Sequence, residues 1–385
     1  MILTSNWNYP TSVRFGPGRI AELAEACKAA GMKTPLIVTD PGLAGMPMIG
    51  AMKDILEKAG MRTAVYADVK PNPVEANVSG GVEVYKAGGH DGVVAVGGGS
   101  ALDAGKCVAF MAGQTRSIWD FEDIGDWWTR ANAAVIAPIV AVPTTAGTGS
   151  EVGRAGVITN EETHTKKIIF HPLMMPKIVI CDPELTVGLP PKLTAGTGMD
   201  ALAHCIEAYC APGYHPMADG IGVEGVRLCK EYLPRAFARG DDIEARAGMM
   251  SAAAMGATAF QKGLGAIHSL SHPVGALYDT HHGLTNAVFM PYVLTFNRPA
   301  IEERIARLAA YCGLEPSFDA FLAWVMELRG ELGIPATVAD LGVDAEKADL
   351  IAEMAIADPT AGSNPVKLTR EAARSIFDRA LAGEV

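Results

Sequence analysis

The sequence predicts an α/β domain built on a parallel sheet, followed by an all-α domain. In the first half of the 385 residues, short runs of apolar, β-branched residues alternate with helical patterns. Such continuous apolar strands are typical of a parallel sheet that helices cover on both faces. From Pro191 onward the sequence is rich in alanine and leucine and follows helical patterns instead. We therefore divide the chain near Leu189, into domains 1–189 and 190–385.

The individual elements follow from the same patterns. Strands are expected at 35–40, 64–69, 92–96, 139–143 and 178–181, where β-branched residues dominate. Helices are expected between several of these strands, at 18–30, 73–86 and 101–112. In the second half, Pro212-Gly213, Gly240-Asp241 and Pro335 interrupt the helical pattern.

Composition excludes several classes of protein. Hydrophobic residues make up 49% and charged residues 19%, as in an ordinary globular protein. The net charge is −11 and no cluster of Lys and Arg stands out, so we expect no nucleic-acid partner. We expect no membrane segment, because no run of about 18 apolar residues occurs, and no signal-peptide pattern is present. The seven scattered cysteines contain no C-x-x-C pair, which predicts reduced thiols and a cytoplasmic location.

A glycine-rich turn follows the expected strand at 92–96. Its sequence is GGGS at 97–100, and the helix that begins there contains Asp103. Glycines let a backbone approach a ligand closely, and the free N–H groups of a first helical turn attract phosphate. Ser100 could both cap the helix and donate to a phosphate. The turn matches neither a Walker A loop nor the G-x-G-x-x-G fingerprint, so a plain tight turn remains the alternative.

Two further positions support a phosphate-bearing cofactor. The segment PTTAGTGSE at 143–151 follows another apolar strand, and open α/β sheets bind ligands at the carboxyl ends of their strands. Asp40 ends the first clear strand, where a carboxylate could accept from the adenosine ribose hydroxyls and would repel a 2′-phosphate. An ordinary polar loop and a strand-end turn are the alternatives.

Histidines cluster in the second half of the chain. Four of the nine lie within 268–282, and His268 and His272 are four apart, which places them on one face of a helix. Asp200 and His204 show the same spacing in an apolar setting. Side chains from two such faces could converge on one divalent cation, Fe2+ or Zn2+. A single histidine in such a helix is usually a hydrogen-bonded core residue, so the prediction depends on the whole set.

Together, these motifs resemble those of the iron-containing (group III) alcohol dehydrogenase family. The most specific segments are GGGSALDAGK, PTTAGTGSE, DPELTVGLPP, GMDALAHCIEAY and the histidine cluster, and the resemblance covers nearly the whole chain. It implies a dehydroquinate synthase-like architecture, with a Rossmann-like NAD-binding domain first and a helical metal-binding domain second. It also implies an active site in the cleft and at least a homodimer.

The resemblance implies roles for individual residues. The family's metal ligands fall on Asp200, His204, His268 and His282, and an active-site histidine that is not a permanent ligand falls on His272. The resemblance and the glycine-rich turn together give the NAD-binding positions as Asp40, Asn72, Gly98, Gly99, Ser100, Asp103, Thr144, Thr145, Lys166 and Leu185. Lys166 is preferred to the lysine that follows it by its ungapped spacing from the first metal ligand.

The chain departs from the family pattern at two positions. The family commonly has a hydroxyl residue where Gly153 stands, so one cofactor hydrogen bond is expected to be missing. It commonly has proline where His281 stands. His281 could line the substrate pocket or act as a base that contacts a metal ligand. It also makes the ligand assignment ambiguous between two adjacent histidines, and His282 is preferred because Gly283 directly follows it.

These observations predict an NAD-dependent, metal-containing alcohol dehydrogenase that transfers hydride between a small primary alcohol and nicotinamide. The resemblance favours Fe2+, Zn2+ is possible, and His272 is the candidate proton relay. A hydroxy acid or semialdehyde is the alternative substrate. A carbon–oxygen lyase similar to dehydroquinate synthase is a less favoured function, because it would need more Lys and Arg near the histidines than residues 191–290 contain. A non-catalytic scaffold is also less favoured, because it would not need the metal-ligand residues. The alcohol, the physiological direction and the oligomeric state stay open.

Overall fold

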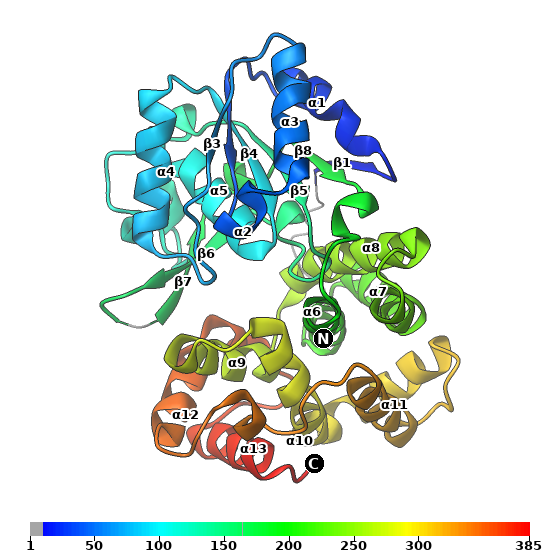
Figure 1. Ribbon diagram of the computed structural model, residues 1–385. Coiled ribbons are helices and arrows are strands. Elements are labelled where there is room, and N and C mark those ends of the chain that lie inside the picture. Colours follow the sequence, from blue (N-terminus) through cyan, green and yellow to red (C-terminus); the bar gives the residue numbers. More distant parts are fainter. Residues whose placement is uncertain (1–10, 164) are drawn as a thin grey trace. The chain divides into compact units, whose positions relative to one another are not determined.

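The computed structural model describes residues 11–163 and 165–385, which form two compact units (Figure 1). The first, here called the sheet unit, contains 11–145 and Gly149–Val187. The second, here called the helical unit, contains Ala146–Thr148 and Gly188–Val385. The short segment Ala146–Thr148 therefore groups with the helical unit, although it lies in the first half of the sequence.

A six-stranded parallel sheet forms the centre of the sheet unit. In spatial order its strands are β1 (Ser12–Phe15), β8 (Ile178–Cys181), β5 (Ile139–Pro143), β4 (Gly92–Gly97), β2 (Pro35–Val38) and β3 (Ala64–Tyr66). The four inner strands are buried along their whole length. This burial on both faces explains their nearly continuous apolar sequences.

Helices cover both faces of the sheet (Figure 1). Successive strand residues point to opposite faces: Val94 belongs to a core cluster with residues of α1 and α3, whereas Ala95 faces α5. The approach of α5 is so close that a Cβ on Gly105 would lie 2.6 Å from the Cβ of Ala95. The helices of this unit are α1 (Leu23–Ala29), α2 (Pro41–Ala44), α3 (Pro47–Lys58), α4 (Glu75–Ala87) and α5 (Gly99–Met111).

An antiparallel hairpin of β6 (Ala155–Asn160) and β7 (Thr165–Phe170) packs against α5. Lys106 of α5 is only 1% exposed, and its ammonium group donates to the carbonyl oxygens of Ser150, at 2.9 Å, and Ala155. The carboxylate of Asp103 lies 3.1 Å from this ammonium group and accepts from the backbone N–H of Val157 at 2.9 Å. The two members of this ion pair therefore attach the start of the hairpin to the helix through hydrogen bonds.

The helical unit is built around α6, whose residues are buried over most of its length and which packs against α7, α8 and α10. The helices α6 and α10 approach each other closely at Gly283, where an added Cβ would lie 2.1 Å from the carbonyl oxygen of Gly196. The helices are α6 (Pro191–Cys210), α7 (Pro216–Ala238), α8 (Ile243–Ala259), α9 (Ala266–Tyr278), α10 (His282–Tyr311), α11 (Phe318–Glu331), α12 (Ala348–Ala357) and α13 (Arg370–Ala382).

The predicted fold class is confirmed, and all five expected strands are present. The expected helix at 18–30 begins as a 3-10 turn before α1, and the helix expected at 101–112 begins two residues earlier, at Gly99. Three strands were not expected: β1, β6 and β7. β1 is a short edge strand with three of its four residues exposed, so it lacks the apolar run that marks the inner strands.

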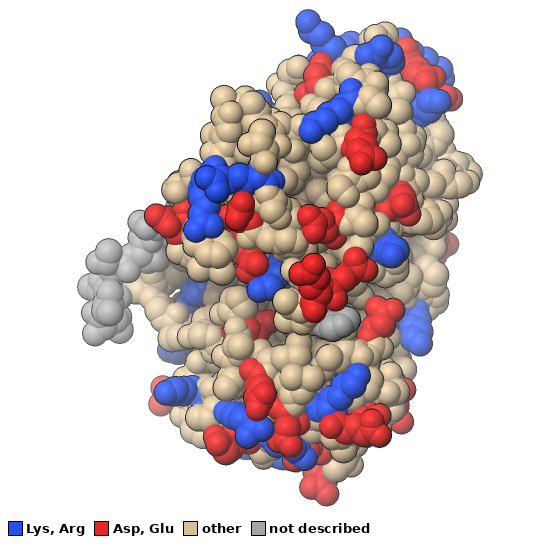
Figure 2. Space-filling view, turned by 90° about the vertical axis from the view of Figure 1, so that its left-hand side faces the viewer, with Lys and Arg blue, Asp and Glu red and all other residues tan. Residues whose placement is uncertain are grey.

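Among the described residues, no helix is both long and apolar enough to cross a membrane. Figure 2 shows acidic and basic side chains interspersed over one face of the molecule, with uncharged surface between many of them. On the described part of this face, the view shows no continuous basic area of the kind that tracks a nucleic-acid backbone.

Candidate metal centre and cofactor-binding loops

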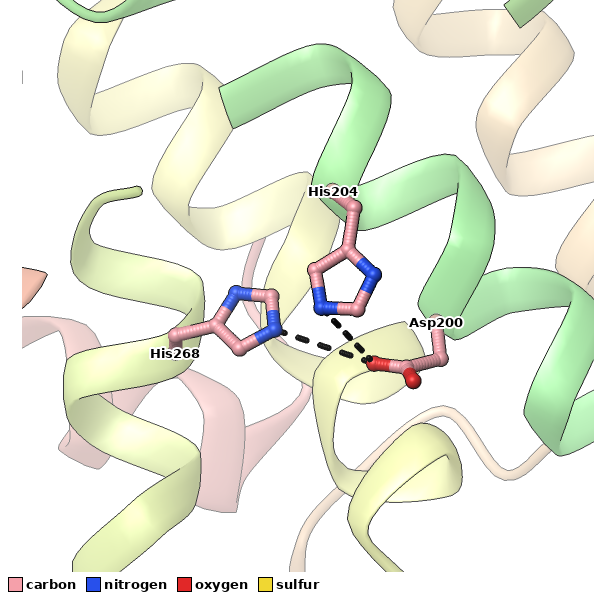
Figure 3. A group of neighbouring side chains, drawn as sticks. All are labelled: Asp200, His204 and His268. Atoms are coloured by element: carbon pink, nitrogen blue, oxygen red, sulfur yellow. Dashed lines mark ion pairs between the residues drawn. The ribbon is translucent and has the colours of Figure 1, made fainter. Parts of the chain in front are cut away.

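Three buried side chains from two helices point toward one another in the helical unit (Figure 3). Asp200 and His204 lie one turn apart on α6, and His268 lies in the first turn of α9. Their exposed fractions are 2%, 5% and 2%. One possible ligand atom from each residue lies within 4.8 Å of the other two. The i,i+4 spacing thus places a carboxylate and an imidazole on one face of α6.

His282 brings a fourth donor to this group. It is the first residue of α10, and its Nε2 lies 3.5 Å from the Oδ1 of Asp200. The Nε2 atoms of His204 and His268 lie 3.8 and 3.7 Å from the same oxygen. Bonds of about 2.0–2.2 Å at tetrahedral angles place ligand atoms roughly 3.3–3.6 Å apart. The separation from His282 lies in this range, and those from His268 and His204 exceed it by only about 0.1–0.2 Å. The residues present therefore fit a divalent metal ion.

The two remaining histidines of the cluster lie beside this group in different roles. The ring of His272 stacks on that of His282, with centroids 5.4 Å apart, and its Nδ1 lies 2.7 Å from Oδ2 of Asp358. Because the carboxylate engages Nδ1, Nε2 is the ring nitrogen left for other partners. His281 is the N-cap of α10, where its Nδ1 accepts the backbone N–H of Leu284 at 3.4 Å.

Burial and neighbouring charges shift the pKa values within the group. Burial alone would raise the pKa of Asp200, but His204, His282 and His268 hold it well below its usual range. Burial lowers the pKa of His204 to about 4, which favours the neutral form that binds metals. Burial would also lower the pKa of His268, but Glu207 and Asp200 outweigh it and raise the value to about 9. The carboxylates of Asp200 and Glu207 thus stabilise positive charge within the group, which would also favour a bound cation.

Sequence reasoning missed Glu207, which supports the group from the same helix as the first two ligands. Its Oε2 lies 2.6 Å from Nδ1 of His268, and its exposed fraction is 6%. A signal was present, because Glu207 stands three residues after His204 in an apolar helical run, where a carboxylate is rarely buried without a partner.

Asn286 is a second residue whose contact with the predicted ligands was not expected from the sequence. It lies one turn after His282 on α10 and is completely buried. Its Nδ2 donates to Oδ1 of Asp200 at 2.8 Å and lies 3.2 Å from Nε2 of both His268 and His282. Asn286 therefore touches three of the four predicted ligands.

Several predicted cofactor residues gather at the carboxyl ends of neighbouring strands in the sheet unit. Asp40 follows β2, the glycine-rich turn follows β4, and Thr144 and Thr145 follow β5. A Cβ on Gly97 would lie 3.4 Å from Oδ2 of Asp40, and one on Gly98 would lie 3.3 Å from Cγ2 of Thr145. These loops are therefore side by side where open α/β sheets bind ligands.

The glycine-rich turn forms the start of α5. Gly98 is the N-cap, and Gly99 and Ser100 are the first two residues of the helix. The first N–H groups of a helix have no partner within it, which suits an anion. Gly97 has a φ of 140°, a conformation that side chains strongly disfavour, so the turn depends on glycine there.

The remaining predicted cofactor residues have different surroundings. Asn72 lies in the loop after β3 with a φ of 52°. Lys166 lies on β7 opposite Thr159, which forms a bridge with Val74 and so joins the hairpin to this loop. Leu185 follows β8 and packs partly buried against the core. The carboxylate of Asp103 is engaged inside the sheet unit, as described above.

We expect Glu151, at the end of the threonine-rich loop, to make the stability of the sheet unit depend on pH. It is 3% exposed, and burial raises its pKa to about 7 although Lys106 opposes the shift. The folded chain therefore holds a proton that the unfolded chain has lost, so we expect the free energy of unfolding to fall as pH rises from about 4.5 to 7. Urea denaturation at several pH values should show a flatter profile for Glu151→Gln. The exposed Glu161→Gln is the control, and an unchanged profile in Glu151→Gln would contradict the assignment.

Comparisons with known proteins show the family of this chain. Residues 10–183 match the family model for iron-containing alcohol dehydrogenases, and residues 194–381 match the model for the C-terminal part of the same family. The chain belongs to the iron-containing alcohol dehydrogenase family. It is 38% identical to 4-hydroxybutyrate dehydrogenase from Cupriavidus necator, over 97% of this chain and 99% of that one. It is 36% identical to the NAD-dependent methanol dehydrogenase of Bacillus methanolicus, over 98% and 100%.

A solved structure of 1,3-propanediol oxidoreductase has the same fold, with a TM-score of 0.93 at 36% identity over 98% of this chain and 100% of that one. Family membership confirms the prediction of an oxidoreductase of the metal-containing alcohol dehydrogenase class. The relatives include enzymes named for alcohols and one named for a hydroxy acid, so both substrate classes expected from the sequence occur among them.

Proposed function

We propose that this chain catalyses NAD-dependent hydride transfer between a small primary alcohol and its aldehyde, with Fe2+ bound by Asp200, His204, His268 and His282. The convergence of these four side chains from three helices is the observation that supports this most strongly. In this proposal residues 1–189 bind NAD and residues 190–385 hold the metal. The same donors also accept Zn2+.

When bound, the cation would supply Lewis-acid polarisation of the substrate oxygen, and the nicotinamide would carry the hydride. The residues of the chain hold and orient these partners. Asp200, His204 and His268 are buried, so they keep water away from one side of the centre. His272 would exchange the substrate's proton at Nε2, because Asp358 holds its Nδ1 at 2.7 Å and fixes the ring.

For the cofactor, we propose that the first turn of α5 and the two threonines bind the pyrophosphate and that Asp40 binds the adenosine ribose. The clustering of these loops at adjacent strand ends supports the assignment. The proposed NAD-binding set is Asp40, Asn72, Gly98, Gly99, Ser100, Asp103, Thr144, Thr145, Lys166 and Leu185.

Asp40→Ser tests the role of the carboxylate in cofactor choice. Asp40 is also the N-cap of α2, accepting from the backbone N–H of Leu43 at 3.0 Å, and serine preserves that function. Removing the charge should end a repulsion of about 1–4 kcal/mol toward a 2′-phosphate. We expect the ratio of kcat/KM with NADP to that with NAD to rise about fivefold or more. An unchanged ratio in steady-state assays would contradict the ribose assignment.

A substrate panel tests the proposed reaction itself. Purified, Fe2+-loaded protein with NAD should form NADH, measured by absorbance, with one or more short alcohols. The panel should include methanol and 1,3-propanediol. It should also include 4-hydroxybutyrate, because the similarity to a 4-hydroxybutyrate dehydrogenase favours a hydroxy acid as the second candidate. No turnover in either direction, from protein that binds both metal and NAD, would contradict a dehydrogenase.

The proposal extends to partners and location. We propose a small-molecule alcohol or aldehyde as the substrate and a homo-oligomer, a dimer or larger, as the assembly. The seven cysteines are free and buried, which supports a reducing, cytoplasmic setting. Light scattering after gel filtration would measure the mass of the assembly, and a monomer at micromolar concentration would contradict it.

A further inference from the structure

The carboxylate of Glu207 makes two buried hydrogen bonds, one from each oxygen. Oε1 accepts the backbone N–H of Ile267 at 2.7 Å, and Oε2 lies 2.6 Å from Nδ1 of His268. Ile267 is the second residue of α9, so its N–H is one of those that lack a partner within the helix. One side chain on α6 therefore contacts both the start of α9 and the predicted ligand that this first turn carries.

The hydrogen bond to His268 decides which ring nitrogen can bind a metal. An ionised carboxylate only accepts hydrogen bonds, so Nδ1 must carry the proton that it shares with Oε2. The other nitrogen, Nε2, lies 3.7 Å from Oδ1 of Asp200 and faces the donor group (Figure 3). A neutral imidazole with its proton on Nδ1 presents a free electron pair at Nε2, which is the form that coordinates a cation there.

We propose that Glu207 is a positioning residue that sets the tautomer and orientation of His268 for metal binding. The inference rests on the proposed function, because it takes His268 as a metal ligand. Glu207 also joins α6, which carries Asp200 and His204, to the helix that carries the third ligand. The position of His268 relative to Asp200 and His204 thus depends on this buried carboxylate.

The competing explanation is that Glu207 only caps the start of α9. The structure offers a variant that separates capping from positioning. Asn364 caps the same helix start, since its Oδ1 accepts the backbone N–H of Ala266 at 3.0 Å. Among the described hydrogen bonds of Asn364, none involves His268. Asn364→Ala therefore removes a cap of α9 without removing the partner of the imidazole.

The variant Glu207→Gln tests the positioning role most directly. The amide has one accepting oxygen, which can serve either Ile267 N–H or His268 Nδ1–H, and its NH2 group then faces the other donor. When the oxygen serves Ile267, the NH2 group faces Nδ1 and disfavours the metal-binding form of His268. When the oxygen serves His268, the NH2 group faces the N–H of Ile267 and displaces the first turn of α9, which carries His268. We expect the affinity of metal-free, full-length protein for Co2+, titrated by visible absorption, to fall about 10- to 100-fold. Asn364→Ala should lower the thermal midpoint but change the Co2+ affinity by less than about threefold.

The outcomes separate this inference from the proposed function. Unchanged Co2+ affinity in Glu207→Gln, or an equal loss in Asn364→Ala, would overturn the positioning role while the metal site stands. Failure of the wild-type protein to bind Co2+ would overturn both. If Glu207→Gln does not fold, 15N NMR of the Zn2+-loaded wild-type protein decides. A protonated Nδ1 and a coordinated Nε2 in His268 support the role, and the reverse arrangement overturns it.

Discussion

His268→Ala should lose both bound metal and turnover. His268 supplies a donor from α9, and its removal leaves Asp200 and His204 of α6 with one remaining imidazole, from α10. Loss of a group that only supports a ligand weakens metal binding about 10- to 100-fold, so loss of the ligand itself should exceed that. We expect kcat/KM to fall by more than about 100-fold. Metal content by mass spectrometry and steady-state rates measure both effects.

His90→Ala is the matched control for this variant. His90 is also buried, but it lies in the sheet unit, where its Nδ1 contacts the carbonyl oxygen of Thr34 at 2.9 Å. It should keep its full metal content and activity even if the protein is less stable. Turnover retained by His268→Ala at the wild-type rate would show that this histidine is not a ligand.

Gly283→Ala should disrupt the helical unit and the metal site together. A Cβ at this position would lie 2.1 Å from the carbonyl oxygen of Gly196 and 3.3 Å from the Cβ of Asp200. Because the obstacle is backbone, α6 and α10 must move apart, and they carry Asp200 and His282. We expect a loss of about 3 kcal/mol or more in the free energy of unfolding, at the upper end for overpacked sites. Metal affinity should fall as well.

Gly330→Ala provides the comparison. Gly330 lies in α11, and a Cβ there would meet nothing within 4 Å. Replacing an unobstructed helical glycine with alanine should stabilise the protein by about 0.4–1 kcal/mol. Denaturant unfolding curves of the metal-free variants measure both changes. Equal stability of the two variants would mean that the helices do not approach as closely as the structure shows.

The parts of the fold that depend on local pattern could be predicted from the sequence. Inner strands such as β4 and β5 are continuous apolar runs because helices cover both of their faces. The hairpin of β6 and β7 has no such run, since most of its residues are only partly buried and Lys166 and Lys167 interrupt β7. Its position comes from the hydrogen bonds that Lys106 and Asp103 of α5 make with Ala155 and Val157, which are contacts distant in sequence.

The candidate site also has residues that the local sequence pattern predicts and residues that it does not. The helical spacing of Asp200 and His204 predicted one face of the centre, because i,i+4 neighbours share a face whatever the tertiary structure. Glu207 and Asp358 were missed because their histidine partners are 61 and 86 residues away. Asn286 lies only four residues after His282, but the carboxylate of Asp200 to which it donates is 86 residues away. No local pattern encodes such pairs. A buried carboxylate or amide in an apolar helix signals that a partner exists but not where it lies.

X-ray absorption spectroscopy of the Fe2+-loaded protein tests the central claim most directly, because it reports the atoms bound to the metal. The account predicts nitrogen and oxygen neighbours at about 2.0–2.2 Å and the outer-shell scattering of roughly three imidazole rings. That outer-shell signal should weaken in His268→Ala. A coordination shell of oxygen alone, without imidazole scattering, would contradict the convergence of these helices on one cation.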